Sequence, residues 1–352
     1  MWKLRWYIAK SVFFSILLVT LVLISIDTIF TLVTQIGQVG SGFTVADAVE
    51  FTLMRLPSDL YLMIPVTAFL GALIGLGHLA SKSELVAMRA AGVSVLQIAS
   101  GVAWAAIFFV VVTYALGLYV SPVTRHWAYF KKNSAGHSQA VLVLASATWL
   151  KSGDHFIFIG KTLPDGHLAD LMDFDVVDNE LKNVTSAQYA TVRRSNWSLE
   201  NAKVLDVNTQ QITSHTYKEI PRTIKVSPNL IRILTLEPAD MTVPALWAYI
   251  HYRVKNQLDP RPYQLQLWER VFQPITVLIL MLLAVPFVFG PLRSSSAGVR
   301  VIIGVVVGFA FYILSQFFGS FSLLYHVIPF WGAAFPSLLF LLVLILLVRR
   351  IN

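Results

Sequence analysis

Residues 155–177 read HFIFIGKTLPDGHLADLMDFDVV, and this stretch decides how the rest of the chain divides. Apolar and polar side chains alternate at both of its ends, and the turn residues Pro164-Asp165-Gly166 lie between them. Alternation with period two indicates β-strands, and similar pieces continue across 141–236 with turn residues at Asp178-Asn179 and Ser195-Asn196. The stretch therefore predicts an antiparallel sandwich or a partly open barrel.

The interior of such a β-domain can take two forms. A filled hydrophobic core is the commoner case, and the alternative is an apolar interior that is open at its ends. The sequence leaves both open. Charge is nearly balanced over 121–262, with sixteen Lys and Arg against thirteen Asp and Glu, so nucleic acid is not indicated as a partner.

Apolar runs on both sides of the β-domain are long enough to cross a membrane. A bilayer core of about 30 Å needs about 20 helical residues. Hydrophobic residues make up 56% of the chain and charged residues 13%, which excludes an ordinary soluble protein. The expected spans are 9–36, 60–80, 96–120, 266–290, 299–319 and 328–348.

These runs define the fold class and the domains. Open strands cannot lie in hydrocarbon, so the β-domain must sit in water on one side of the membrane. We expect a membrane α-helical protein of six spans with an inserted all-β domain. Its parts are helices over 1–120, the β-domain over 121–262 and helices over 263–352.

The charges of the short loops predict the orientation. One side carries a single acid, Glu84, and the opposite loop over 37–59 carries Arg55 against three acids. The positive-inside rule then places both termini in the cytoplasm and the β-domain outside it. The basic residues of the cytoplasmic side are Lys3, Arg5, Lys10, Lys82, Arg89, Arg293, Arg300, Arg349 and Arg350.

Two features of the outer side have open interpretations. Residues 43–57 are too charged to span, so we expect either a short helix lying on the membrane surface or a solvated connector. Asp27 is the only clear acid within a predicted span, and it is either a functional group or an interfacial one.

The chain carries no recognisable catalytic or metal-binding motif. It lacks cysteine, a G-x-x-x-x-G-K-[ST] phosphate loop, an H-E-x-x-H pair and a G-x-S-x-G elbow. We therefore expect no enzyme activity, no catalytic residue, no metal and no cofactor in this chain. Energy from a nucleotide would have to come from another protein.

Residues 81–92 form the most specific short segment on the cytoplasmic side. Ser83 is placed to cap a helix, Glu84 lies in its first turn, and Gly92 suits its end. Leu85 and Met88 would form an exposed apolar face to which a partner could bind. An ordinary capped turn between two spans is the alternative.

Two groups of motifs carry a family resemblance. The first is FLGALIGLG at 69–77 followed by SELVAM at 83–88. The second group is more specific and lies after the β-domain. It comprises the motifs RPYQL at 261–265, FQP at 272–274, FGPLRS at 289–294, GVRV at 298–301 and GFAFY at 308–312. Together with the layout of the whole chain, these motifs resemble the lipopolysaccharide export permeases, the LptF/LptG family, in its LptG branch.

The resemblance implies a transmembrane subunit of an ABC transporter in the bacterial inner membrane. Such a subunit pairs with LptF, binds a cytoplasmic LptB ATPase dimer that holds ATP and Mg, and associates with LptC. It extracts lipopolysaccharide and passes it towards the outer membrane, with a jellyroll-like periplasmic domain continuing the path. The implied coupling helix covers 82–92, with Ser83, Glu84, Leu85, Met88 and Arg89 as its contact residues.

The resemblance also suggests substrate contacts. Basic residues after the third span, Arg125, Lys131 and Lys132, would reach lipid A phosphates, although a solvated rim is the plainer interpretation. Family members can carry lysines at the outer end of the first span, but 30–40 holds no basic residue here, which makes such a clamp doubtful. The implied acyl-chain gate comprises Leu23, Ile26, Phe30, Phe311, Leu314, Phe317 and Phe318.

Two other function classes stay open at this point. A membrane scaffold that only anchors the β-domain would need no ATPase and no nucleotide-dependent motion. An ion-coupled carrier would need Asp27 for uptake along a proton or sodium gradient.

Overall fold

The computed structural model describes two compact units. The membrane unit comprises Met1–Val39, Ala48–Ala128 and Arg261–Asn352, and the β-unit comprises Gly40–Asp47 and Tyr129–Pro260. The described residues exclude 1, 41, 136–147, 164–166, 178–179, 194–195, 208–211, 225–232, 234–235, 291–294 and 352. The predicted turns at 164–166 and 178–179, as well as Ser195 and Arg293, thus lie outside the described residues.

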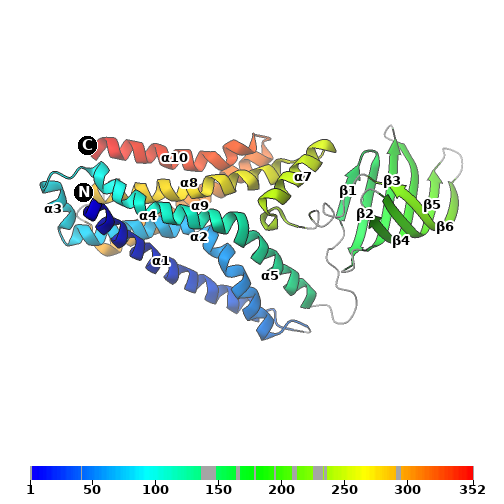
Figure 1. Cartoon of the computed structure of the whole chain (residues 1–352), viewed down its shortest axis with the longest axis horizontal. Coiled ribbons are helices and arrows are strands. Elements are labelled where there is room, and N and C mark those ends of the chain that lie inside the picture. The colour runs from blue at the N-terminus through cyan, green and yellow to red at the C-terminus, as the bar shows by residue number, and fades with distance from the viewer. Residues whose placement is uncertain are drawn as a thin grey trace. The chain divides into compact units, whose positions relative to one another are not determined.

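Among the described residues, six helical segments are long and apolar enough to cross a membrane, and each covers one predicted span to within one residue at its ends (Figure 1). Five of these spans are single helices, and the third continues from α4 through one turn of π-helix, η1, into α5. Their bounds are α1 Trp2–Ile36, α2 Val45–Ser81, α4 Val95–Ala115, η1 Leu116–Val120, α5 Ser121–Ala135, α8 Arg261–Phe289, α9 Ala297–Leu324 and α10 Pro329–Ile351.

Glycines let α2 pack closely against two neighbours. A side chain on Gly71 would collide with the backbone of Ile16 in α1, and one on Gly75 would lie 3.0 Å from the Cα of Val12. On α9, a Cβ on Gly308 would collide with Val66 of α2. Gly71 and Gly75 thus permit close packing of α2 against α1.

Residues 43–57 differ from both expectations. They belong neither to a separate surface helix nor to a connector, because α2 begins at Val45 and runs without a break through Pro57. Asp47 accepts hydrogen bonds from the backbone N–H and the hydroxyl of Thr44, at 2.8 and 2.7 Å, which starts the helix. Figure 1 shows the ribbon of α2 changing direction along its length, as expected where proline removes a helical hydrogen bond.

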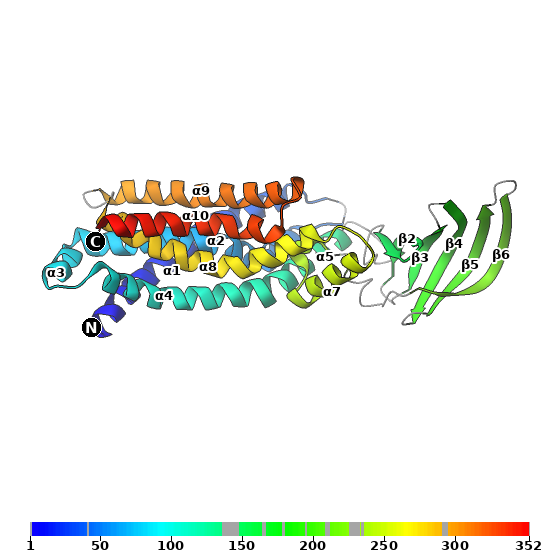
Figure 2. The same ribbon diagram turned by 90° about the horizontal axis from the view of Figure 1, so that it is seen from above.

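The described residues of the β-unit form one six-stranded antiparallel sheet in the consecutive order β1 to β6, of which Figure 2 labels β2 to β6. The predicted alternating pieces lie in β2 and β3, and their side chains join a core around Ile157, Leu171 and Trp197. The inserted β-domain is confirmed, and the described strands form a single sheet rather than the two of a sandwich. The strands are β1 Thr148–Ser152, β2 His155–Thr162, β3 Leu168–Val177, β4 Glu180–Arg193, β5 Asn196–Val207 and β6 Ile212–Thr223.

Helix α7, Val243–Lys255, is bonded to the first edge of this sheet. The hydroxyl of Tyr252 donates to the carbonyl of Lys151 at 2.9 Å and accepts from the Lys151 N–H at 2.8 Å. Burial raises the pKa of the Tyr252 hydroxyl, against the opposing effect of the Lys151 backbone bond. The helix thus occupies backbone groups of β1 that an edge strand would otherwise offer to another chain.

Candidate coupling and substrate sites

The short helix α3, Glu84–Ala90, lies between α2 and α4, where the sequence predicted a coupling helix. Gly92 has φ +85°, a conformation that favours glycine, so its predicted role at the end of the helix is confirmed. The predicted cap by Ser83 is wrong. Ser83 has φ 60° and its side chain makes no capping hydrogen bond, since its backbone is left-handed whereas a capping residue is normally extended.

The apolar side of α3 faces the protein rather than a partner. Leu85 is 1% exposed and joins the core of the membrane unit, and Met88 packs partly buried against that core. The expected exposed face of Leu85 and Met88 is therefore corrected. Val86 and Arg89 are exposed, so both side chains are accessible to a partner.

A hydrogen bond ties α3 to α1. The hydroxyl of Tyr7 donates to Oε2 of Glu84 at 2.8 Å. No sequence signal indicated this pair, because the two residues are 77 positions apart and neither belongs to a periodic pattern. A displacement of α3 must therefore break this bond or move the N-terminal part of α1.

Arg300 ties α9 to the end of α2, just before α3. Its Nη1 donates to the carbonyl of Gly77 at 2.7 Å, and the side chain is buried. Gly77 leaves the space that Arg300 fills, because a Cβ there would lie 2.8 Å from the guanidinium. The sequence analysis counted Arg300 only as a loop charge, whereas the structure makes it an internal bond between two spans.

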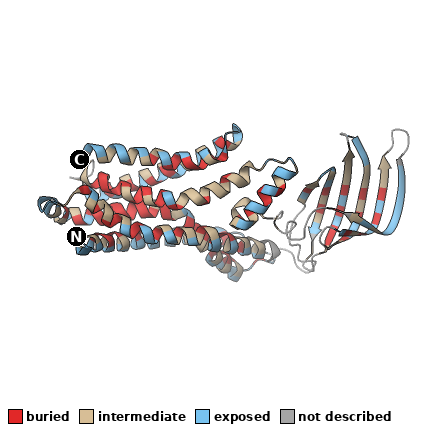
Figure 3. Cartoon of the chain, turned by 45° about the horizontal axis from the view of Figure 1, so that its top comes forward, coloured by how far each residue is buried: buried red, intermediate tan, exposed pale blue. Residues whose placement is uncertain are grey.

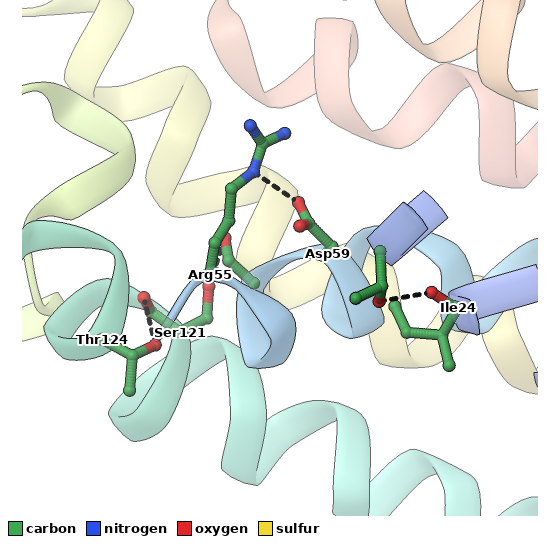
Figure 4. Close-up of polar contacts among 7 residues, drawn as sticks. Ile24, Arg55, Asp59, Ser121 and Thr124 are labelled. Carbon is green, nitrogen blue, oxygen red and sulfur yellow. Dashed lines mark hydrogen bonds and ion pairs between the residues drawn. The ribbon is translucent and has the colours of Figure 1, made fainter. Parts of the chain in front are cut away.

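Polar side chains gather at the other end of the membrane unit in a rim cluster of Arg55, Ser58, Asp59, Ser121 and Thr124. Arg55 and Asp59 of α2 form an ion pair at 2.9 Å, and the hydroxyls of Ser121 and Ser58 lie 3.1 Å apart (Figure 4). Asp59 is almost fully buried, so its carboxylate depends on the neighbouring cations.

The rim cluster accounts for two residues singled out from the sequence. The charges of Asp27 on α1 and Arg125 on α5 both act on the carboxylate of Asp59. Arg125 therefore balances a protein acid at this place, and a phosphate would have to share it. Asp27 likewise lies among charged neighbours.

Lys131 and Lys132 belong to the β-unit, so the structure does not assign them to the rim cluster. Lys131 is exposed, and its charge acts on Asp47 within the same unit. Phosphate contact by Arg125, Lys131 and Lys132 stays a prediction.

The predicted gate residues divide into outward and inward side chains. Ile26 and Phe30 on α1 and Phe317 on α9 are exposed, whereas Phe311 is buried with its ring 5.5 Å from that of Phe340. The others are half-buried: Leu23, Leu314 and Phe318, of which Phe318 packs on Phe335. Figure 3 shows where exposed and buried residues alternate along the helices.

A second acid lies within a span, which the sequence analysis overlooked. Glu269 of α8 is half-buried and approaches Gly319 of α9, where an added Cβ would lie 3.3 Å from its Oε1. Arg270 follows it and is 3% exposed. Asp27 is therefore not the only acid in a predicted span, and the adjacent arginine explains why a carboxylate is tolerated there.

The described residues hold no cluster of three or more His, Cys, Asp or Glu side chains that could bind a metal. A model of the family described as "Lipopolysaccharide export system permease LptF/LptG" matches residues 6–350. The chain belongs to this family.

Relatives of this permease also match nearly all of its length. The lipopolysaccharide export system permease protein LptG of Escherichia coli K12 is 34% identical over 352 residues, covering 98% of this chain and 97% of the relative. The protein of the same description from Haemophilus influenzae is 32% identical over 349 residues, with the same two coverages. The chain is thus a permease subunit of the lipopolysaccharide export system, a multi-pass protein of the inner membrane.

Proposed function

We propose that this permease subunit extracts lipopolysaccharide from the inner membrane and passes it towards the outer membrane, driven by a separate cytoplasmic ATPase that holds ATP and Mg. The observation that carries the proposal is the anchoring of α3. Its Leu85 is buried in the core of the membrane unit, and its Glu84 accepts a hydrogen bond from Tyr7 of α1 at 2.8 Å. A push on α3 by a docked ATPase would therefore reach α1 directly.

The physical task requires such an external motor. Exposing a lipid chain to water costs about 0.8 kcal/mol per methylene, so removing a multi-chain lipid from a bilayer costs tens of kcal/mol. The sequence contains no nucleotide-binding loop. We infer that LptB supplies the energy, that the exposed faces of α1 and α9 serve contacts with LptF and the acyl chains, and that LptC joins the assembly.

The orientation is part of the same proposal. Nine basic residues against one acid support cytoplasmic termini and a cytoplasmic α3. The β-domain then lies in the periplasm, where its apolar core side could continue the lipid path. The rim cluster lies at the opposite end of the spans from α3, which suits contact with phosphates by Arg125.

The test uses the complete complex with its ATPase in proteoliposomes. Glu84→Gln removes the charge of α3 but keeps an acceptor for Tyr7, and Tyr7→Phe removes the bond but keeps the charge. If Glu84 binds the ATPase, Glu84→Gln lowers ATPase copurification and ATP-driven lipopolysaccharide release, whereas Tyr7→Phe keeps copurification and lowers release. Normal copurification and full release by Glu84→Ala would refute the coupling role.

A crosslinking experiment separates the proposal from a scaffold. Photocrosslinkers at Phe30, Phe317 and β3 should capture lipopolysaccharide in an ATP-dependent way. A scaffold predicts no change with ATP. Charge reversal at Lys131 and Lys132 should lower the crosslinking yield near that segment, and an unchanged yield would refute a phosphate contact there.

A further inference from the structure

A groove lined by aromatic rings lies between α1 and α4, outside the residues assigned above. Its cavity has a volume of about 440 Å³, and a second cavity of about 110 Å³ shares Trp6 and Trp104 with it. The larger volume is within the range of about 300–1,000 Å³ that is usual for small-molecule sites. The first cavity is lined by Trp6, Ala9, Lys10, Phe13, Phe14, Trp104, Ala105 and Phe108, and the second by Trp2, Arg5, Trp6 and Trp104.

The walls of this aromatic groove are held in place by ring contacts. Trp2 meets Trp104 edge to face at 5.5 Å, and Phe13 meets Phe108 in the same way at 5.1 Å. Trp6 is 65% exposed, although it lies in a helix of the membrane unit. The groove is therefore a preformed apolar surface that opens towards lipid.

Two cations line the groove, and neither cavity has an acid in its lining. Among the described residues, Lys10 has no ion pair or hydrogen bond, and Nε of Arg5 is buried without a hydrogen-bond partner. Arg5 lies just before the first predicted span and Lys10 lies at its start, where long cationic side chains reach the head groups of anionic lipids. Both cations thus call for an anion close to an apolar surface.

We propose that the groove is a binding site for an anionic glycerophospholipid. One acyl chain lies along Phe13, Phe14 and Phe108, and Lys10 and Arg5 reach the phosphate. The tryptophans lie at the level of the head groups, where indole rings are favoured in membranes. Charge complementarity selects this ligand over a neutral lipid.

The side chains of the groove argue against a partner's helix as the occupant. Helix contacts in membranes favour small residues, as at Gly71 and Gly75 where α2 meets α1. In the groove the small residues Ala9 and Ala105 are buried, and the accessible surface is formed by bulky rings and Lys10. A bound lipid would stabilise the contact of α1 with α4.

The test places the full-length chain in nanodiscs of equal parts phosphatidylglycerol and phosphatidylcholine and counts retained lipids by native mass spectrometry. The wild type should retain phosphatidylglycerol selectively. The pair Arg5→Gln and Lys10→Gln should lower that selectivity about tenfold, since each basic residue contributes to anion binding. The matched control, Lys3→Gln with Arg350→Gln, removes the same charge outside the groove and should keep it.

Three results would overturn the proposal. The first is equal retention of both lipids by the wild type, and the second is unchanged selectivity in the double variant. The third is displacement of phosphatidylglycerol by added lipopolysaccharide, which would assign the groove to the substrate path. The exchange Arg5→Lys with Lys10→Arg keeps the charge and should keep selectivity, so a folding defect of the first variant is distinguishable. None of these readouts requires ATP-driven export.

Discussion

Helices α2 and α8 differ from α1 and α9 in what they face, although all four are apolar enough to span a membrane. In their most apolar windows, 72% of α2 and 61% of α8 are buried within the chain, against 11% of α1 and of α9. The inner pair provides the structural core. The outer pair presents most of its surface to lipid or to another subunit. Apolarity therefore identifies a span, but it does not tell which spans pack inside the chain and which contact lipid or another subunit.

The largest effect is expected where α2 meets α1. In Gly71→Leu the new side chain would collide with Ile16, and overpacking of this kind costs about 3 kcal/mol. Thermal unfolding in detergent should show a clear loss of stability. Gly298→Leu on the outer helix α9 is the control, since no atom lies within 4 Å of the added Cβ. Equal losses in both variants would break the distinction between inner and outer helices.

Arg300→Met tests the buried hydrogen bond between the outer helix α9 and the inner helix α2. It removes a charged hydrogen bond of 2.7 Å to Gly77, and such bonds contribute about 2 kcal/mol. Thermal unfolding should reveal this loss, and hydrogen exchange over 83–92 should speed up because the end of α2 is freed. Arg349→Met removes an exposed charge and should change neither measurement. Unaltered exchange in Arg300→Met would mean that α3 is held without this bond.

Asp173 lies in the β-unit, where the alternation along a strand, and not the packing of helices, decides which side chains are buried. Burial raises the pKa of this carboxyl, against the attraction of His155, 3.0 Å away, and of Arg222, with Asp175 raising it further. The folded state therefore binds the proton more tightly than the unfolded state. Stability from this group is full below the ordinary pKa of an aspartate and is lost as pH rises through the raised value.

Asp173→Asn stays neutral at every pH and should remove this dependence. At neutral pH we expect the variant to be more stable than the wild type, because no charge is buried. Hydrogen exchange of β2 to β4 in the full-length chain, corrected for intrinsic rates, measures the effect across the acidic range. The same pH dependence in both proteins would show that another group is responsible.

The smallest effect is expected on the outer face of α9. Ile302→Ala and Phe309→Ala should each change the stability of the isolated chain by less than about 0.5 kcal/mol, since both side chains are exposed. If α9 contacts LptF as proposed above, the same variants should weaken copurification with LptF. Leu280→Ala on α8 is the inner counterpart and should cost more, about 2–3 kcal/mol. A large loss from Phe309→Ala alone would show that α9 has an internal role.

Much of the fold was predictable because it depends on local pattern. Uninterrupted apolar runs gave the six spans, and alternation gave β2 and β3, since each pattern matches the period of its element. The candidate sites were less predictable. Leu85 was expected on an exposed face but is buried, and Arg300 was counted as a loop charge but bonds Gly77. The helical periodicity of α3 contains no information about which side the bundle covers.

Sequence by itself determined that the chain crosses the membrane six times, carries a β-domain between the third and fourth spans, and resembles the lipopolysaccharide export permeases. Only the tertiary structure decided that α2 and α8 lie inside, that Glu84 is bonded to Tyr7, and that Arg5 and Lys10 line an aromatic groove. The physical reason is that hydropathy is a property of one segment. Burial and pairing are properties of segments that meet from distant parts of the chain.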